Sequence, residues 1–170
     1  MARASDRLAR KLYREELLEK GLDYAQIADE LAQRYGARPR AAWREARGWS
    51  LTEAAARLNG FRAGTGLDPE GLAGMTSAHF SEYETFPGTG PEPQGRKPTP
   101  RFLAELAAVY GCAMTDLVDK ADRKRMTAAD LLVIDAHTAP AAPRRVALLI
   151  AGLRIQITVD QAPGHHDTTR

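Results

Sequence analysis

Signals for the start of a helix recur between residues 49 and 117, and they constrain the fold more than any other feature of the sequence. Ser50 and Glu53 form an S-x-x-E capping box, in which each side chain satisfies a backbone N–H that the start of a helix leaves unpaired. Further helix starts are expected at Thr76, Thr99 and Thr115. Pro100 follows Thr99 at the first helical position, which proline favours. This succession of short helices predicts an all-α fold.

The first 36 residues predict a helical extension before this region. A helix is expected over residues 5–20. A second one is marked by apolar residues at helical spacing: Tyr24, Ile27, Ala28, Leu31 and Tyr35. Gly36 is expected to end it. The next helix, over residues 38–47, is either the third helix of an N-terminal trio that also packs on the main domain, or part of an extension that covers one apolar face.

Two segments rich in glycine and proline predict long loops, at residues 59–75 and 87–95. Long loops inside a compact domain are more often functional or mobile than incidental. The sequence therefore divides into an N-terminal extension (1–36), a helical domain with two loop insertions (37–125) and a C-terminal part (126–170).

The domain over residues 37–125 resembles the Cro/XRE-type helix-turn-helix domain of phage repressors. The motifs that carry the resemblance are the S-x-x-E start at Ser50, Tyr83-Glu84, Arg96-Lys97-Pro98-Thr99, and the run from Leu106 to Gly111. The segments from Arg38 to Ala46 and from Ser81 to Glu84 are similar to an actinobacterial subgroup of these regulators. The resemblance implies a repressor-like bundle and a sequence-specific transcription regulator. Its partner would be double-stranded DNA.

In that family the helix over residues 76–84 enters the major groove. By the resemblance, Phe80 and Tyr83 pack inward, Glu84 braces the fold, and five residues read bases: Thr76, Ser77, Ala78, Ser81 and Glu82. Serine suits several bases, alanine contacts a thymine methyl group, and glutamate accepts from cytosine N4. His79 is either a donor in the groove or a half-buried residue of the helix surface.

The distribution of charge suggests where DNA phosphates bind, although the net charge is only +2. Two basic clusters flank an acidic middle: residues 34–47 hold five arginines and one acid, and residues 96–125 hold seven basic residues and four acids. Residues 49–95, between them, hold two arginines and six acids. Phosphate contacts position a protein on DNA. The candidates for phosphate or loop contacts are Arg38, Arg40, Arg44, Ser50, Thr52, Arg62, Arg96, Lys97 and Arg101. The alternative is that the basic clusters are ordinary solvated helix faces.

The C-terminal part predicts a helix from Thr127 followed by a β segment. Residues 153–159 alternate with β-branched side chains, which indicates a strand. A single strand is unstable alone. It pairs with residues 146–150 as a hairpin, with another subunit as a homodimer, or folds back on the same chain. Residues 164–170 are expected to be disordered.

Enzymatic and membrane functions are not expected. The sequence lacks a phosphate-binding loop, a dinucleotide fingerprint and an H-E-x-x-H motif, so neither catalysis nor a cofactor or metal is expected. No apolar run approaches the ~20 residues that span a bilayer. The single cysteine, Cys112, is typical of a cytoplasmic protein. The alternative function is a protein–protein interaction module on a repressor-like scaffold, with weak or no DNA binding.

Overall fold

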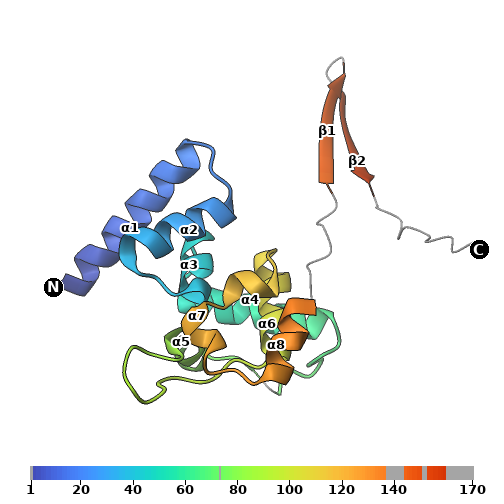
Figure 1. Ribbon diagram of the computed structural model, residues 1–170. Coiled ribbons are helices and arrows are strands. Elements are labelled where there is room, and N and C mark those ends of the chain that lie inside the picture. The colour runs from blue at the N-terminus through green and yellow to red at the C-terminus, as the bar shows by residue number, and fades with distance from the viewer. Residues whose placement is uncertain (1, 73, 137–143, 151–152, 160–170) are drawn as a thin grey trace, which may run out of the picture. The chain divides into compact units, whose positions relative to one another are not determined.

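The computed structural model describes residues 2–72, 74–136, 144–150 and 153–159 of the 170. The chain forms two compact units, Met1–Thr138 and Ala139–Arg170. All regular elements in the described part of the first unit are helices, which confirms the all-α prediction for this unit (Figure 1). Its elements are α1 (Ala2–Glu19), α2 (Tyr24–Tyr35), α3 (Pro39–Ala46), α4 (Leu51–Gly64), α5 (Ser77–Thr85), α6 (Pro100–Tyr110), the 3₁₀ turn η1 (Met114–Leu117), α7 (Lys120–Arg123) and α8 (Ala128–Ala136).

The caps expected at Ser50, Thr76 and Thr99 begin α4, α5 and α6. The start expected at Thr115 was wrong, because Thr115 lies inside η1, which begins at Met114. The Ser50 hydroxyl accepts a hydrogen bond from the backbone N–H of Glu53, and the Glu53 carboxylate accepts one from Ser50 N. The hydroxyls of Thr76 and Thr99 cap α5 and α6 in the same way. Gly111 ends α6 in the left-handed conformation, with φ of 68°. These caps satisfy backbone groups that a helix end leaves unpaired.

One continuous core links the helices of the first unit. Its fully buried large apolar side chains come from six of these elements and are Ile27, Leu31, Leu58, Phe80, Leu103, Leu106, Tyr110, Leu117 and Ile134. Aromatic rings join α5 to α6 within this core, since Tyr83 stacks on Phe102 with 4.0 Å between ring centroids. The core therefore fixes α5 against α6.

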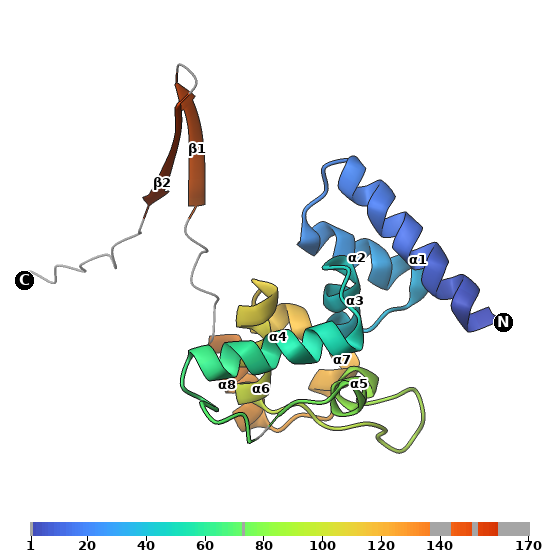
Figure 2. The same cartoon turned by 180° about the vertical axis from the view of Figure 1, so that it is seen from behind.

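The short helix α3 packs in two directions (Figure 1 and Figure 2). On one side it contacts α2 and α1, and on another it contacts α5 and η1. Two arginines of α1 hold the first contact: Arg10 pairs with Glu45 at 3.2 Å, and Arg14 Nε donates to the Ala46 carbonyl at 2.8 Å. These contacts agree with the prediction of one helix shared between the N-terminal trio and the main bundle.

The predicted loop at residues 59–75 begins later than expected. α4 continues through Asn59 and ends at Gly64. The Arg62 guanidinium near its end pairs with Glu105 of α6 at 2.7 Å, so a tertiary contact supports a turn that glycine weakens locally. The prediction that the loop starts at residue 59 was wrong. The helical turn α7 was not predicted.

The second unit contains two strands, β1 (Arg144–Ile150) and β2 (Leu153–Val159). They pair antiparallel with each other, in a register that runs from Arg144 opposite Val159 to Ile150 opposite Leu153. The residues 164–170, for which disorder was expected, lie outside the described part of the chain.

Candidate nucleic-acid interface

The helix α5 has one buried face and one exposed face. Phe80 is fully buried, and its ring lies edge-on to Phe102 with the centroids 6.4 Å apart. Tyr83 is half-buried on the same face and stacks on Phe102. The exposed residues of the helix are Ala78, His79, Glu82 and Thr85. The inward packing of Phe80 and Tyr83 follows the sequence prediction.

Two side chains fix the start of α5. The Asn59 side chain, on α4, donates to the Met75 carbonyl at 2.9 Å and accepts from Met75 N at 2.7 Å. The Thr76 hydroxyl then accepts from His79 N at 3.2 Å. The long loop between α4 and α5 is thus closed at its end by a side chain of α4. This contact holds the first turn of α5 against α4 despite the insertion.

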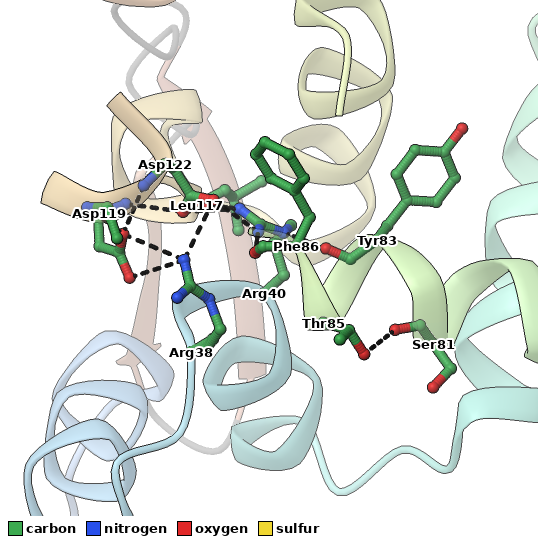
Figure 3. Close-up of polar contacts among 10 residues, drawn as sticks. Arg38, Arg40, Ser81, Tyr83, Thr85, Phe86, Leu117, Asp119 and Asp122 are labelled. Atoms are coloured by element: carbon green, nitrogen blue, oxygen red, sulfur yellow. Dashed lines mark hydrogen bonds and ion pairs between the residues drawn. The ribbon is translucent and has the colours of Figure 1, made fainter. Parts of the chain in front are cut away.

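A buried arginine fixes the end of α5 (Figure 3). Arg40 of α3 donates to the carbonyls of Tyr83 and Phe86 at 2.8 and 2.7 Å. Both of its terminal nitrogens bind the Asp122 carboxylate, at 3.0 and 2.9 Å. Neither side chain has any exposed area. The charge of Arg40 is therefore neutralised inside the protein, where an unpaired charge would be very costly.

The five residues expected to read bases lie together on α5 and its cap. Thr76, Ala78 and Glu82 are exposed, and Ser77 and Ser81 are half-buried. The Glu82 carboxylate pairs with Arg96 at 3.3 Å, and both side chains are about half exposed. The side chain of His79 is exposed on the same helix, so the interpretation of His79 as a half-buried residue was wrong.

The prediction that Arg40 contacts a DNA phosphate was wrong. A guanidinium with no exposed area cannot reach a phosphate while it holds Asp122. The sequence could not show this pairing, because Asp122 lies 82 residues away along the chain. Arg40 is a structural residue that joins α3, α5 and the segment after η1.

Arg44 is also engaged inside the protein. Its guanidinium binds Glu84 at 2.7 and 3.0 Å and donates to the Trp49 carbonyl at 2.8 Å. Burial lowers the pKa of Arg44, but the hydrogen bond and charge of Glu84 outweigh it, so the pKa is raised and the guanidinium stays charged. With its side chain 13% exposed, Arg44 acts as a brace between α3 and α5 and offers little to a phosphate.

The other candidates differ in how open they are. Arg62 and Arg101 both bind the buried Glu105, but Arg101 remains 71% exposed while Arg62 is 15% exposed. Lys97 pairs with Asp130 at 2.7 Å. Thr52 is exposed at the start of α4, next to the capping hydroxyl of Ser50. The exposed residues among the expected contacts are therefore Ser50, Thr52, Arg96 and Arg101.

Sequence reasoning missed two residues that belong to this surface. Asn59 holds the start of α5, and its only sequence signal was its place at the edge of a glycine-rich stretch. Arg57 is exposed on α4, with its guanidinium carbon 4.3 Å from the centre of the Trp49 ring. It adds a positive charge beside the start of α4.

Two other kinds of site were sought in the described residues. No three His, Cys, Asp or Glu side chains there are placed to hold a metal ion. None of the helices described is both long and apolar enough to cross a bilayer. No protein-family description, curated protein or solved structure matches this chain.

Proposed function

We propose that the protein is a transcription regulator that binds double-stranded DNA through α5, on a scaffold of the repressor helix-turn-helix type. The observation that supports this most is a short polar helix face held rigidly at both ends. Asn59 holds its start and Arg40 holds its end. A base-reading helix needs such fixation, because base contacts depend on how the helix enters the groove.

The exposed chemistry of α5 suits a modest base readout. The hydroxyls of Ser77 and Ser81 donate to or accept from several bases, and the methyl group of Ala78 fits that of thymine. Glu82 and Arg96 form an exposed acceptor and donor pair, which suits cytosine and guanine respectively. Because this pair is half exposed, its two partners separate at small cost. Cytoplasmic location follows from this proposal.

The test is fluorescence anisotropy of the full chain on duplex DNA from upstream of its own gene, compared with a scrambled duplex over a salt series. Tighter binding to the upstream duplex, with affinity that falls steeply as salt rises, is the expected result. Ser77→Ala and Glu82→Ala are expected to reduce the discrimination between the duplexes. Gln33→Ala, at an exposed position of α2, is the control and should bind as the unchanged protein does.

One observation favours a second candidate, a protein-interaction module with weak or no DNA binding. α5 carries Glu82 and Glu84 but no lysine or arginine. Three of the arginines expected near DNA, Arg40, Arg44 and Arg62, bind carboxylates instead. For this candidate, binding to both duplexes is equally weak, and Glu82→Ala changes neither. That result, in a protein that remains folded by circular dichroism, would reject the DNA-binding proposal for these duplexes.

A further inference from the structure

A pocket between the loop after α5 and the segment after α7 is lined by three cationic side chains. They are Arg38, Lys124 and Arg125, and the loop contributes Gly88, Thr89 and Gly90. We refer to these six residues as the basic pocket. Its volume is about 430 Å³, which lies within the ~300–1,000 Å³ typical of small-molecule sites. None of the described residues that line it is acidic.

A second pocket of the same unit has a different balance of charge and serves as a comparison. That pocket, of about 290 Å³, is lined by two cations, Arg62 and Arg101, and by two acids, Asp68 and Glu105. Its charges cancel, and both arginines bind Glu105. In the basic pocket, by contrast, the positive charges outnumber the negative charges that they face.

The carboxylates that pair with a cation of the basic pocket are Asp119 and Asp122. Arg38 binds Asp119 at 3.1 Å and Asp122 at 3.2 Å, and Asp122 is shared with the buried Arg40 (Figure 3). Arg125 donates to the Pro91 carbonyl at 2.8 Å, a neutral partner that leaves its charge uncompensated. Lys124 is exposed, and its side chain makes no hydrogen bond or ion pair with any described residue. Two uncompensated cations therefore lie at the pocket.

Unused hydrogen-bond donors accompany these charges. Arg38 Nε is buried and has no partner among the described residues. The Thr89 hydroxyl and the backbone N–H of Gly90 also make no hydrogen bond to described residues. The backbone of the loop packs closely at Gly88, which has φ of 75°, and a Cβ on this residue would lie 2.9 Å from Gln94 Cβ. Cations together with free N–H and O–H donors are what a phosphate group binds.

From this combination we infer that the basic pocket is an anion site that takes a phosphate group. The phosphate comes either from a small phosphorylated molecule or from a DNA backbone. The inference does not depend on α5 binding DNA, because none of its six residues belongs to α5. It assigns to Lys124 and Arg125, outside the motifs of the repressor-like domain, a role in binding.

The probe for the first test is inorganic phosphate, followed in the full chain through the amide chemical shifts of Gly88 and Gly90. Sodium chloride at equal ionic strength is the reference. A saturable shift with phosphate alone is expected. Lys124→Gln should weaken phosphate binding roughly tenfold, the scale of one charge-assisted hydrogen bond. Lys120→Gln is the matched control, an exposed lysine nearby in the sequence that does not line the pocket, and it should bind as the unchanged protein does.

Duplex DNA then distinguishes the two sources of phosphate. If the site takes a backbone phosphate, Lys124→Gln weakens the binding of both inorganic phosphate and the duplex. If it takes a small phosphorylated molecule, only the binding of inorganic phosphate weakens. Shifts that are the same with chloride, or unchanged affinity for phosphate in Lys124→Gln, would overturn the inference. Ser77→Ala, which tests α5, should leave phosphate binding unchanged, so the two proposals fail separately.

Discussion

Arg40 and Asp122 form a two-pronged ion pair with no exposed area, between residues 82 positions apart. Arg40 also donates to the carbonyls of Tyr83, Phe86 and Leu117, so the pair ties the end of α5 to α3 and η1. This ion pair therefore positions the end of α5, although neither of its residues lies on the exposed surface of that helix.

Asp122→Asn is expected to lower the free energy of unfolding by about 3–5 kcal/mol, because it leaves the buried charge of Arg40 without a counter-charge. The measurement is urea denaturation followed by circular dichroism. Asp119→Asn is the matched control, since Asp119 pairs with Arg38 and is 35% exposed. The control should cost less than about 1 kcal/mol. Equal losses in the two variants would show that burial of the pair does not determine its contribution.

Asn59→Ala is expected to release the start of α5. The change leaves the N–H and carbonyl of Met75 without their partner, which costs about 1–2 kcal/mol at a half-buried site. Amide hydrogen exchange should become faster in the first turn of α5 and remain unchanged in α2. Denaturation gives the energy, with Gln33→Ala on α2 as the control. Exchange that stays slow at His79 and Phe80, whose amides donate to the hydroxyl and the carbonyl of Thr76, would mean that Asn59 does not hold the helix.

Gly95→Ala is expected to disrupt the connection between α5 and α6. Gly95 has φ of 79°, and a Cβ on it would overlap the Glu82 carbonyl oxygen and lie 2.8 Å from Phe86 N. Because both contacts are with backbone, the chain must move, and a loss above about 2 kcal/mol is expected. Gly90→Ala is the control, because the nearest atoms to its Cβ are 3.8 Å away. Thermal unfolding of both variants tests the difference.

The stability of the protein is expected to fall above about pH 9. Burial, together with the charge of Asp116, raises the pKa of the Cys112 thiol to about 12, whereas an exposed thiol has a pKa of about 8.5. Between these values the unfolded chain releases the proton and the folded chain keeps it, so rising pH favours unfolding. Burial also raises the pKa of Tyr110 well above its ordinary value, in the same direction.

The melting temperature measured from pH 7 to 11 checks this expectation. Cys112→Ala removes the contribution of the thiol, which reaches at most about 1.4 kcal/mol for each pH unit between the two pKa values. The variant should therefore lose less stability than the unchanged protein over this range. Parallel curves for the two proteins would show that Cys112 ionises in the folded state as readily as in the unfolded one.

Local signals predicted the helices well, because caps act within a few residues. Ser50, Thr76 and Thr99 each begin a helix through a hydrogen bond to a backbone group three residues on. Gly36 and Gly111 end helices in the left-handed conformation that glycine adopts without strain. The polar face of α5 followed from the same kind of information, since Phe80 and Tyr83 mark the opposite face by their spacing.

Contacts over long stretches of sequence were not predictable in this way. Arg40 looked like any other residue of a basic helix until Asp122 was placed beside it. The sequence predicted a loop for the last turn of α4, because the ion pair that stabilises this turn joins Arg62 to Glu105 of another helix. The basic pocket likewise joins Arg38 to Lys124 and Arg125 across more than half of the chain, so no motif could indicate it.

Because α3 packs in two directions, the N-terminal helices and the candidate interface both contact the same short helix. α3 is eight residues long. Glu45 is the partner of Arg10 of α1, and Arg40 holds the end of α5. A molecule that shifted α1 would therefore pull on the same rigid element that orients α5.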